Sequence, residues 1–181
     1  MGTTDSLKGE RSDQERANQE RIDLLASLDR HRDFLRRTTR GLTDEQAAER
    51  TTVSDLCVGG LIKHVAMVER QWARFIAEGP SAMTFEGGDP NAFMNSFRML
   101  DGETLTGLLE HYHEVARQTD DLVRGLSDLD AGHPLPQAPW FEPGASWSAR
   151  RVLLHIIAET SQHAGHADII RESLDGAKTM G

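Results

Sequence analysis

The feature that most constrains this chain is a row of ionisable side chains in its last helical segment, residues 146–174. His155, Glu159, His163 and His166 recur there every three or four residues, so at about 100° per residue they share one face of a helix. Apolar residues continue the same face, namely Val152, Ile156, Ile170 and Leu174. Buried ionisable groups cost free energy unless hydrogen bonds, a counter-charge or a metal ion satisfy them. The row therefore predicts a polar site inside the protein.

Length, charge and cysteine usage exclude several classes of protein. The 181 residues fit one domain, expected over residues 15–181 behind a flexible polar leader of residues 1–14. A net charge of -9 without a basic stripe disfavours nucleic acid and anionic membrane surfaces as partners. The chain has neither a membrane-spanning run of about 20 apolar residues nor a signal-peptide core, and its single cysteine suits a reducing compartment. We therefore expect a soluble, cytoplasmic protein.

Helical periodicity recurs in four segments, residues 14–40, 61–78, 102–125 and 146–174. A capping box from Thr43 to Gln46 predicts one short helical turn over residues 44–49, and Gly59-Gly60 predicts a tight turn into the second long helix. Glycine and proline mark long connections after the second and third long helices. The pattern predicts an all-α four-helix bundle with long crossover connections. The connection over residues 85–97 is long enough to form one wall of a site.

Glu159 and His163 are the pair best spaced to bind one metal ion. Side chains four residues apart on a helix lie about 5–6 Å apart at Cβ, and His64, at the edge of the apolar stripe of the second helix, can supply a third ligand. Two histidines and one carboxylate leave a fourth position open, as at catalytic zinc sites. We expect a divalent ion, with Zn²⁺ first and Ni²⁺, Fe²⁺ or Mn²⁺ as alternatives. A hydrogen-bonded pair without metal is the competing interpretation.

Three sequence segments carry a resemblance to a known superfamily. They are LCVGGLIKHVAMVERQW, FIAEGP and LLHIIAETSQHAGHADIIRESLDG. With these, residues 16–176 resemble an actinobacterial branch of the DinB-like superfamily of metal-binding four-helix bundles, which includes mycothiol and bacillithiol S-transferases and mycothiol-dependent maleylpyruvate isomerases. The resemblance implies His64, Glu159 and His163 as metal ligands. Many relatives have histidine where this chain has Glu159, but the isomerase branch is similar to it in having glutamate there. The resemblance also makes a homodimer a candidate assembly.

A metal-bound thiol of a small molecule, whose free pKa is about 8.5, is deprotonated at neutral pH and becomes a nucleophile. We therefore expect a metal-dependent transferase that activates a low-molecular-weight thiol, first of all mycothiol, for attack on small electrophiles in detoxification. A thiol-dependent cis–trans isomerase and a non-catalytic metal-binding or stress-response protein are the alternatives.

Several further residues receive expected roles beside the three ligands. His166 either orients the ligands or exchanges a proton with the substrate, and it is the predicted catalytic residue. Trp140 and Arg171 are predicted to position the thiol cosubstrate and its acceptor. His155 is expected to form hydrogen bonds behind the ligands, and Cys57 to be a small buried residue rather than a nucleophile.

Overall fold

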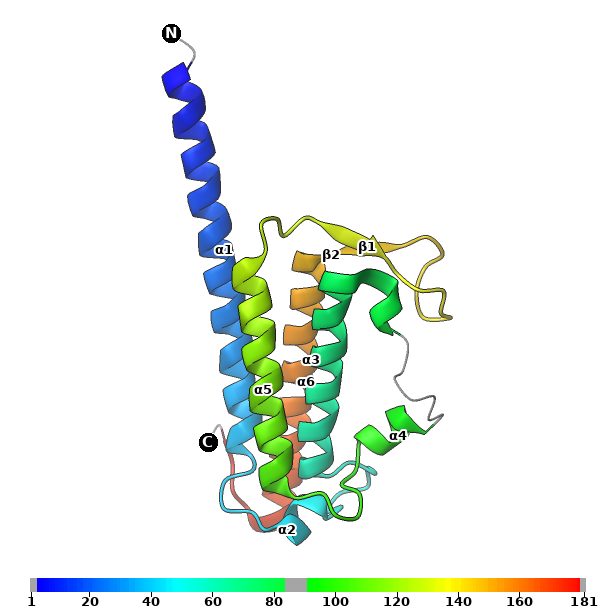
Figure 1. The fold of residues 1–181 in the computed structure, drawn as a ribbon. Coiled ribbons are helices and arrows are strands. Elements are labelled where there is room, and N and C mark those ends of the chain that lie inside the picture. The colour runs from blue at the N-terminus through cyan, green and yellow to red at the C-terminus, as the bar shows by residue number, and fades with distance from the viewer. Residues whose placement is uncertain (1–2, 84–90, 180–181) are drawn as a thin grey trace.

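Four long helices form the body of the protein in a computed structural model that describes residues 3–83 and 91–179, with side chains from residue 15 onward. The predicted all-α bundle is confirmed (Figure 1). No helix in the described part of the chain is both long and apolar enough to cross a membrane. The first helix begins well before the expected residue 14, and its N-terminal end extends beyond the other helices (Figure 1). The four helices are α1 (Thr3–Arg37), α3 (Val58–Glu78), α5 (Leu105–Gly125) and α6 (Ala149–Asp175).

The helix directions require one crossover along the bundle. α1 packs against α5 and α6, and α3 packs against the same two helices. α1 and α6 run in one direction, whereas α3 and α5 run in the other (Figure 1). The chain must therefore return along the bundle between α3 and α5, and this crossover carries the 3-10 helix η1 (Gly79–Met83) and the short helix α4 (Ala92–Ser96).

The connection between α5 and α6 stays at one end of the bundle, because these helices are antiparallel (Figure 1). It contains two short strands that the sequence did not predict, β1 (Gly132–Pro134) and β2 (Ser146–Ser148), paired antiparallel with His133 opposite Trp147. Both strands are edges of a two-stranded sheet, so a proline is tolerated there. Consequently α6 begins after Ser148, whose hydroxyl caps the helix by accepting a hydrogen bond from the Arg151 amide.

A close approach between α3 and the crossover depends on Gly60. The predicted turn at Gly59-Gly60 is wrong, because α3 begins at Val58 and both glycines lie in its first turn. A Cβ atom at position 60 would lie only 2.0 Å from the carbonyl oxygen of Phe97. Glycine therefore lets the crossover backbone lie directly on α3, beside the face that carries His64 one turn later.

A charged layer separates the core into two apolar clusters. One cluster includes Leu35 and Val65, the other includes Leu28 and Trp72, and the layer lies between them along the helices. Its main members are Arg32 of α1, Glu69 of α3 and Asp120 of α5. Arg32 and Glu69 are fully buried, with Arg32 Nε donating to Glu69 Oε2 at 3.1 Å and Nη1 donating to Asp120 Oδ1 at 2.8 Å. Three of the four long helices are thereby joined through one guanidinium group.

Replacing Glu69 by leucine tests this layer. The substitution leaves the buried guanidinium of Arg32 without its main counter-charge, so the free energy of unfolding should fall by about 3–5 kcal/mol, as measured by urea unfolding. Asp33→Ala is the control, because this carboxylate pairs with Arg37 at the surface and its loss should cost at most about 1 kcal/mol. The explanation is wrong if Glu69→Leu leaves the urea midpoint unchanged, or if adding Arg32→Met restores no stability.

Candidate metal centre

His64, Glu159 and His163 converge where α3 packs against α6. One ligand atom from each residue lies within 4.8 Å of the other two. Glu159 and His163 are one turn apart on α6, with 3.4 Å between Oε2 and Nε2, and the rings of His64 and His163 have centroids 4.9 Å apart. The structure therefore brings together the three residues that the sequence predicted as ligands.

A hydrogen-bonded chain orients His64. Its Nδ1 atom lies 2.9 Å from the hydroxyl oxygen of Ser96, and this hydroxyl donates to the carbonyl oxygen of Phe93 at 2.6 Å. Because the hydroxyl has a single proton, it accepts the hydrogen bond from His64 Nδ1–H, which assigns the tautomer from the network. The Nε2 atom then carries the lone pair that a metal ion requires. The ring of Phe97 stacks on His64 at 3.8 Å between centroids and prevents it from tilting.

The charges of the three residues suit a divalent cation. Burial, assisted by the neighbouring His163 ring, lowers the pKa of His64 to about 4, so His64 is neutral at physiological pH. The hydrogen bond from His163 lowers the pKa of Glu159 although burial opposes it, so this carboxylate is ionised. Two imidazole nitrogens and one carboxylate oxygen form a donor set that first-row divalent ions accept. The residues present therefore fit a bound metal ion.

His166 lies behind the ligands rather than at the substrate side. Its Nδ1 atom is 3.3 Å from Nδ1 of His163, and it is not among the described residues that line the adjacent cavity. In the tautomer in which His163 Nδ1–H donates a hydrogen bond to His166 Nδ1, the Nε2 atom of His163 has a lone pair that can bind a metal ion in place of its hydrogen bond to Glu159. Of the two roles expected for His166, this position supports orientation of a ligand and not proton exchange with a substrate.

A cavity of about 970 Å³ opens beside the three ligands. This volume is at the upper end of the range of small-molecule sites, about 300–1,000 Å³. Its walls come from α3, α4, α6 and the connection between β1 and β2, and much of the lining is aromatic. The aromatic residues are Trp72, Phe93, Phe97, Trp140 and Phe141. A small molecule in this cavity would contact several aromatic side chains and could reach His64, Glu159 and His163.

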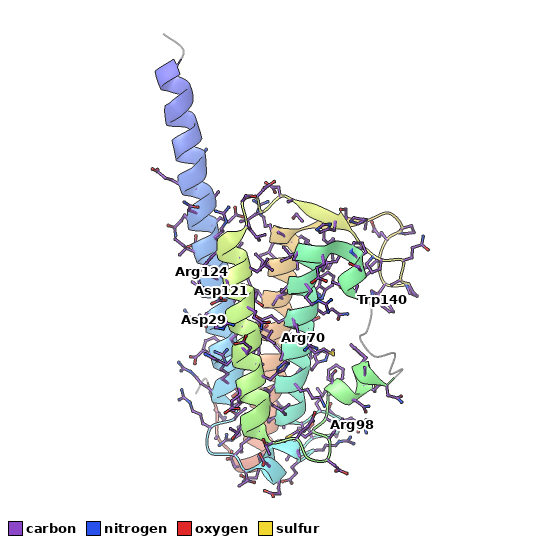
Figure 2. The ribbon with its side chains drawn as sticks, in the orientation of Figure 1. Asp29, Arg70, Arg98, Asp121, Arg124 and Trp140 are labelled. Atoms are coloured by element: carbon purple, nitrogen blue, oxygen red, sulfur yellow. The ribbon has the colours of Figure 1, made fainter. Side chains whose placement is uncertain are left out.

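Some of the other predicted site residues line the cavity and others do not. Trp140 lines the cavity from the connection between the strands (Figure 2). The predicted wall over residues 85–97 contributes Phe93 and Phe97 to the lining, whereas Phe85 lies outside the described residues.

Arg171 is not part of this cavity. Its Nη1 atom donates to the carbonyl oxygens of Thr38 and Arg40 at 2.8 Å, and its guanidinium pairs with Asp175. A contact of Arg171 with a substrate in the cavity is therefore not supported. The reason is that residue 171 lies two turns beyond His163, at the end of the bundle, where its side chain ties α6 to the end of α1.

Two further residues have roles that the sequence could not assign fully. Ser96 was not predicted at all, because no pattern in the crossover indicates which residue will reach His64. His155 makes edge contacts with the stacked rings of Trp72 and Trp147, at centroid distances of 4.8 and 5.2 Å, and it lines the cavity. Cys57 is buried, as expected, and its sulfur accepts a hydrogen bond from the Gly60 amide at the start of α3.

Substitution of single histidines tests the ligand set. Protein purified without a histidine tag should contain about one divalent ion per chain, measured by elemental analysis, and His163→Asn should lose it. His155→Asn is the matched control, because His155 is on the same helix and lines the same cavity without belonging to the cluster. If His163→Asn binds metal as well as the wild type does, His163 is not a ligand.

Removal of the Ser96 hydroxyl tests the orientation of His64. Ser96→Ala should weaken metal binding about 10- to 100-fold, measured by competition with a fluorescent chelator, because His64 Nδ1–H loses its acceptor. Ser161→Ala on α6 is the control and should bind as the wild type does. Melting of both metal-free variants separates a local effect from general destabilisation. An unchanged affinity in Ser96→Ala would show that Phe97 alone holds the ring.

Comparison with known proteins gives the family and the fold. The family model described as mycothiol S-transferase matches residues 23–176, and no curated protein matches the chain. A crystal structure of a conserved protein from Enterococcus faecalis is similar with a TM-score of 0.62 and 15% identity, over 85% of this chain and 96% of that one. At this identity the likeness supports the fold alone. The family match covers most of the chain and includes all three clustered residues, and the chain therefore belongs to the mycothiol S-transferase family of DinB-like proteins.

Proposed function

We propose that the protein is a metal-dependent transferase that uses mycothiol to attack small electrophilic molecules. The observation that carries this proposal is the position of His64, Glu159 and His163 in the wall of a large cavity. These three residues would hold a divalent ion, which would bind a thiol sulfur and lower the thiol pKa from about 8.5, so that the thiolate would form at neutral pH.

The residues of the chain hold the reacting groups and exclude water. Ser96 and His166 lie within hydrogen-bond distance of the two histidine rings and would hold them in the orientation that a bound ion needs. The aromatic walls keep water away from the sulfur atom. Water would otherwise solvate the thiolate and make it a weaker nucleophile. The thiol proton leaves to solvent, the sulfur forms a bond to the electrophilic carbon, and the leaving group departs with its electron pair.

The polar part of the cavity supports mycothiol over charged thiols. Gln71, Gln137 and Gln162 line the cavity, and no lysine or arginine does so among the described residues. Amide groups match the hydroxyl and amide groups of mycothiol, which has no ionised group apart from its thiol. Glutathione and bacillithiol carry carboxylates, whose transfer from water is unfavourable without a counter-charge.

The test is the rate of conjugation of a bimane electrophile by metal-loaded protein with mycothiol, bacillithiol or glutathione. We expect acceleration that is greatest with mycothiol, because only this thiol is free of carboxylates. Chelation should abolish the acceleration and added Zn²⁺ should restore it. Glu159→Ala should lose the activity, while Glu172→Ala, on an exposed face of the same helix, should keep it.

Two results would contradict the transferase. If the protein still accelerates the conjugation after the metal is removed, the cluster does not activate the thiol through a metal ion. No acceleration with any thiol, together with lower melting temperatures for His64→Ala, Glu159→Ala and His163→Ala, would instead support a metal site that stabilises the fold.

A further inference from the structure

Some aromatic side chains that line the cavity are exposed to solvent rather than packed against other residues of the protein. Among the described residues, the large hydrophobic side chains that remain exposed include two aromatic ones, Phe93 at 48% and Trp140 at 78%. Both line the cavity, although they come from different connections of the fold. Exposed aromatic surface that is gathered at one concave site indicates a ligand with complementary apolar surface.

Trp140 offers a ring face for such a ligand. It lies in the connection between β1 and β2, on the side of the bundle where α4 also lies (Figure 2). The ring contact described for Trp140 is an edge contact with Phe141, at 6.2 Å and 66°, and Phe141 in turn meets Trp72 edge-on at 6.3 Å. Since Trp140 remains 78% exposed, much of its indole is open to a ligand, and aromatic rings prefer offset stacking on such a surface.

No lysine or arginine lines the cavity in the described part of the chain. Two cations on the helices that carry the clustered residues are engaged elsewhere, since Lys63 pairs with Glu103 at 2.6 Å and the Arg151 guanidinium lies over the Trp147 ring at 4.6 Å. Residues 84–90, outside the described part, contain Glu86 and Asp89 but no lysine or arginine. With a divalent ion bound, the Glu159 carboxylate and the thiolate would together neutralise its charge, so an anionic acceptor would lose its hydration without gaining a counter-charge.

We propose that the acceptor substrates are uncharged, planar aromatic electrophiles that bind between Trp140 and the Phe93–Phe97 wall, and that anionic acceptors are rejected. This inference rests on the proposed function and names its substrate class. In the reaction with a chloroarene, the thiolate sulfur bonds to the ring carbon that carries chlorine. The carbon–chlorine bond breaks, and chloride leaves with the electron pair. A dicarboxylate acceptor, which the isomerase alternative requires, does not fit the same cavity.

A matched pair of acceptors tests the rejection of charge. Chlorodinitrobenzene is neutral and chlorodinitrobenzoate is anionic, and each rate is divided by the uncatalysed rate with mycothiol. The neutral acceptor should have the higher kcat/KM by at least about tenfold. Gln71→Arg adds a cation to the cavity wall and should shift the ratio toward the anionic acceptor. Gln118→Arg makes the same charge change on the exposed face of α5 and should not. Equal ratios for the two acceptors in the wild type would overturn the inference.

Binding without reaction separates this inference from the proposed function. Dinitrobenzene and dinitrobenzoate cannot be conjugated by loss of chloride, and tryptophan fluorescence quenching reports their binding to metal-loaded protein that is saturated with mycothiol. Dinitrobenzene should bind more tightly, and Trp140→Ala should weaken it about three- to tenfold, with Trp140→Phe in between. If dinitrobenzene binds but no acceptor is conjugated, the proposed transferase activity is wrong and the proposed ligand class stands. If acceptors are conjugated but the two analogues bind equally well, the transferase activity stands and the proposed ligand class is wrong.

Discussion

The backbone of the crossover lies on α3 at Gly60 with no space for a side chain between them. This one approach positions several parts of the site together. Ser96 reaches His64 Nδ1 and Phe97 stacks on the same ring, so the crossover orients a ligand that belongs to another element. The adjacent Phe93 then forms a wall of the cavity. A side chain at position 60 would push the crossover away and release all three contacts.

The charged layer of the core complements this local contact. Arg32 and Glu69 lie between the two apolar clusters, so sliding α1 along α3 would place a guanidinium against apolar side chains. The relative height of α1, α3 and α5 is therefore determined by polar as well as apolar packing.

Much of the fold and the ligand cluster could be predicted because both depend on helical periodicity. The four apolar stripes locate the long helices, and the row from His155 to His166 locates the polar face of α6. Ser96, the small sheet and the role of Gly60 could not be predicted, since they depend on where irregular segments lie in space. The same holds for Arg171, although it lies in a helix. Helical periodicity predicts on which face of α6 it lies, but its hydrogen-bond partners beyond the end of α1 depend on tertiary packing.

The three clustered residues and the exposed aromatic side chains of the cavity belong to different parts of the chain. His64, Glu159 and His163 are carried by α3 and α6, whereas Trp140 and Phe93 are carried by the two long connections. Connections tolerate replacement far better than packed helices do. Evolution, or a protein engineer, can therefore change one wall of the cavity by exchanging the β1–β2 loop, while the cluster on α3 and α6 stays the same.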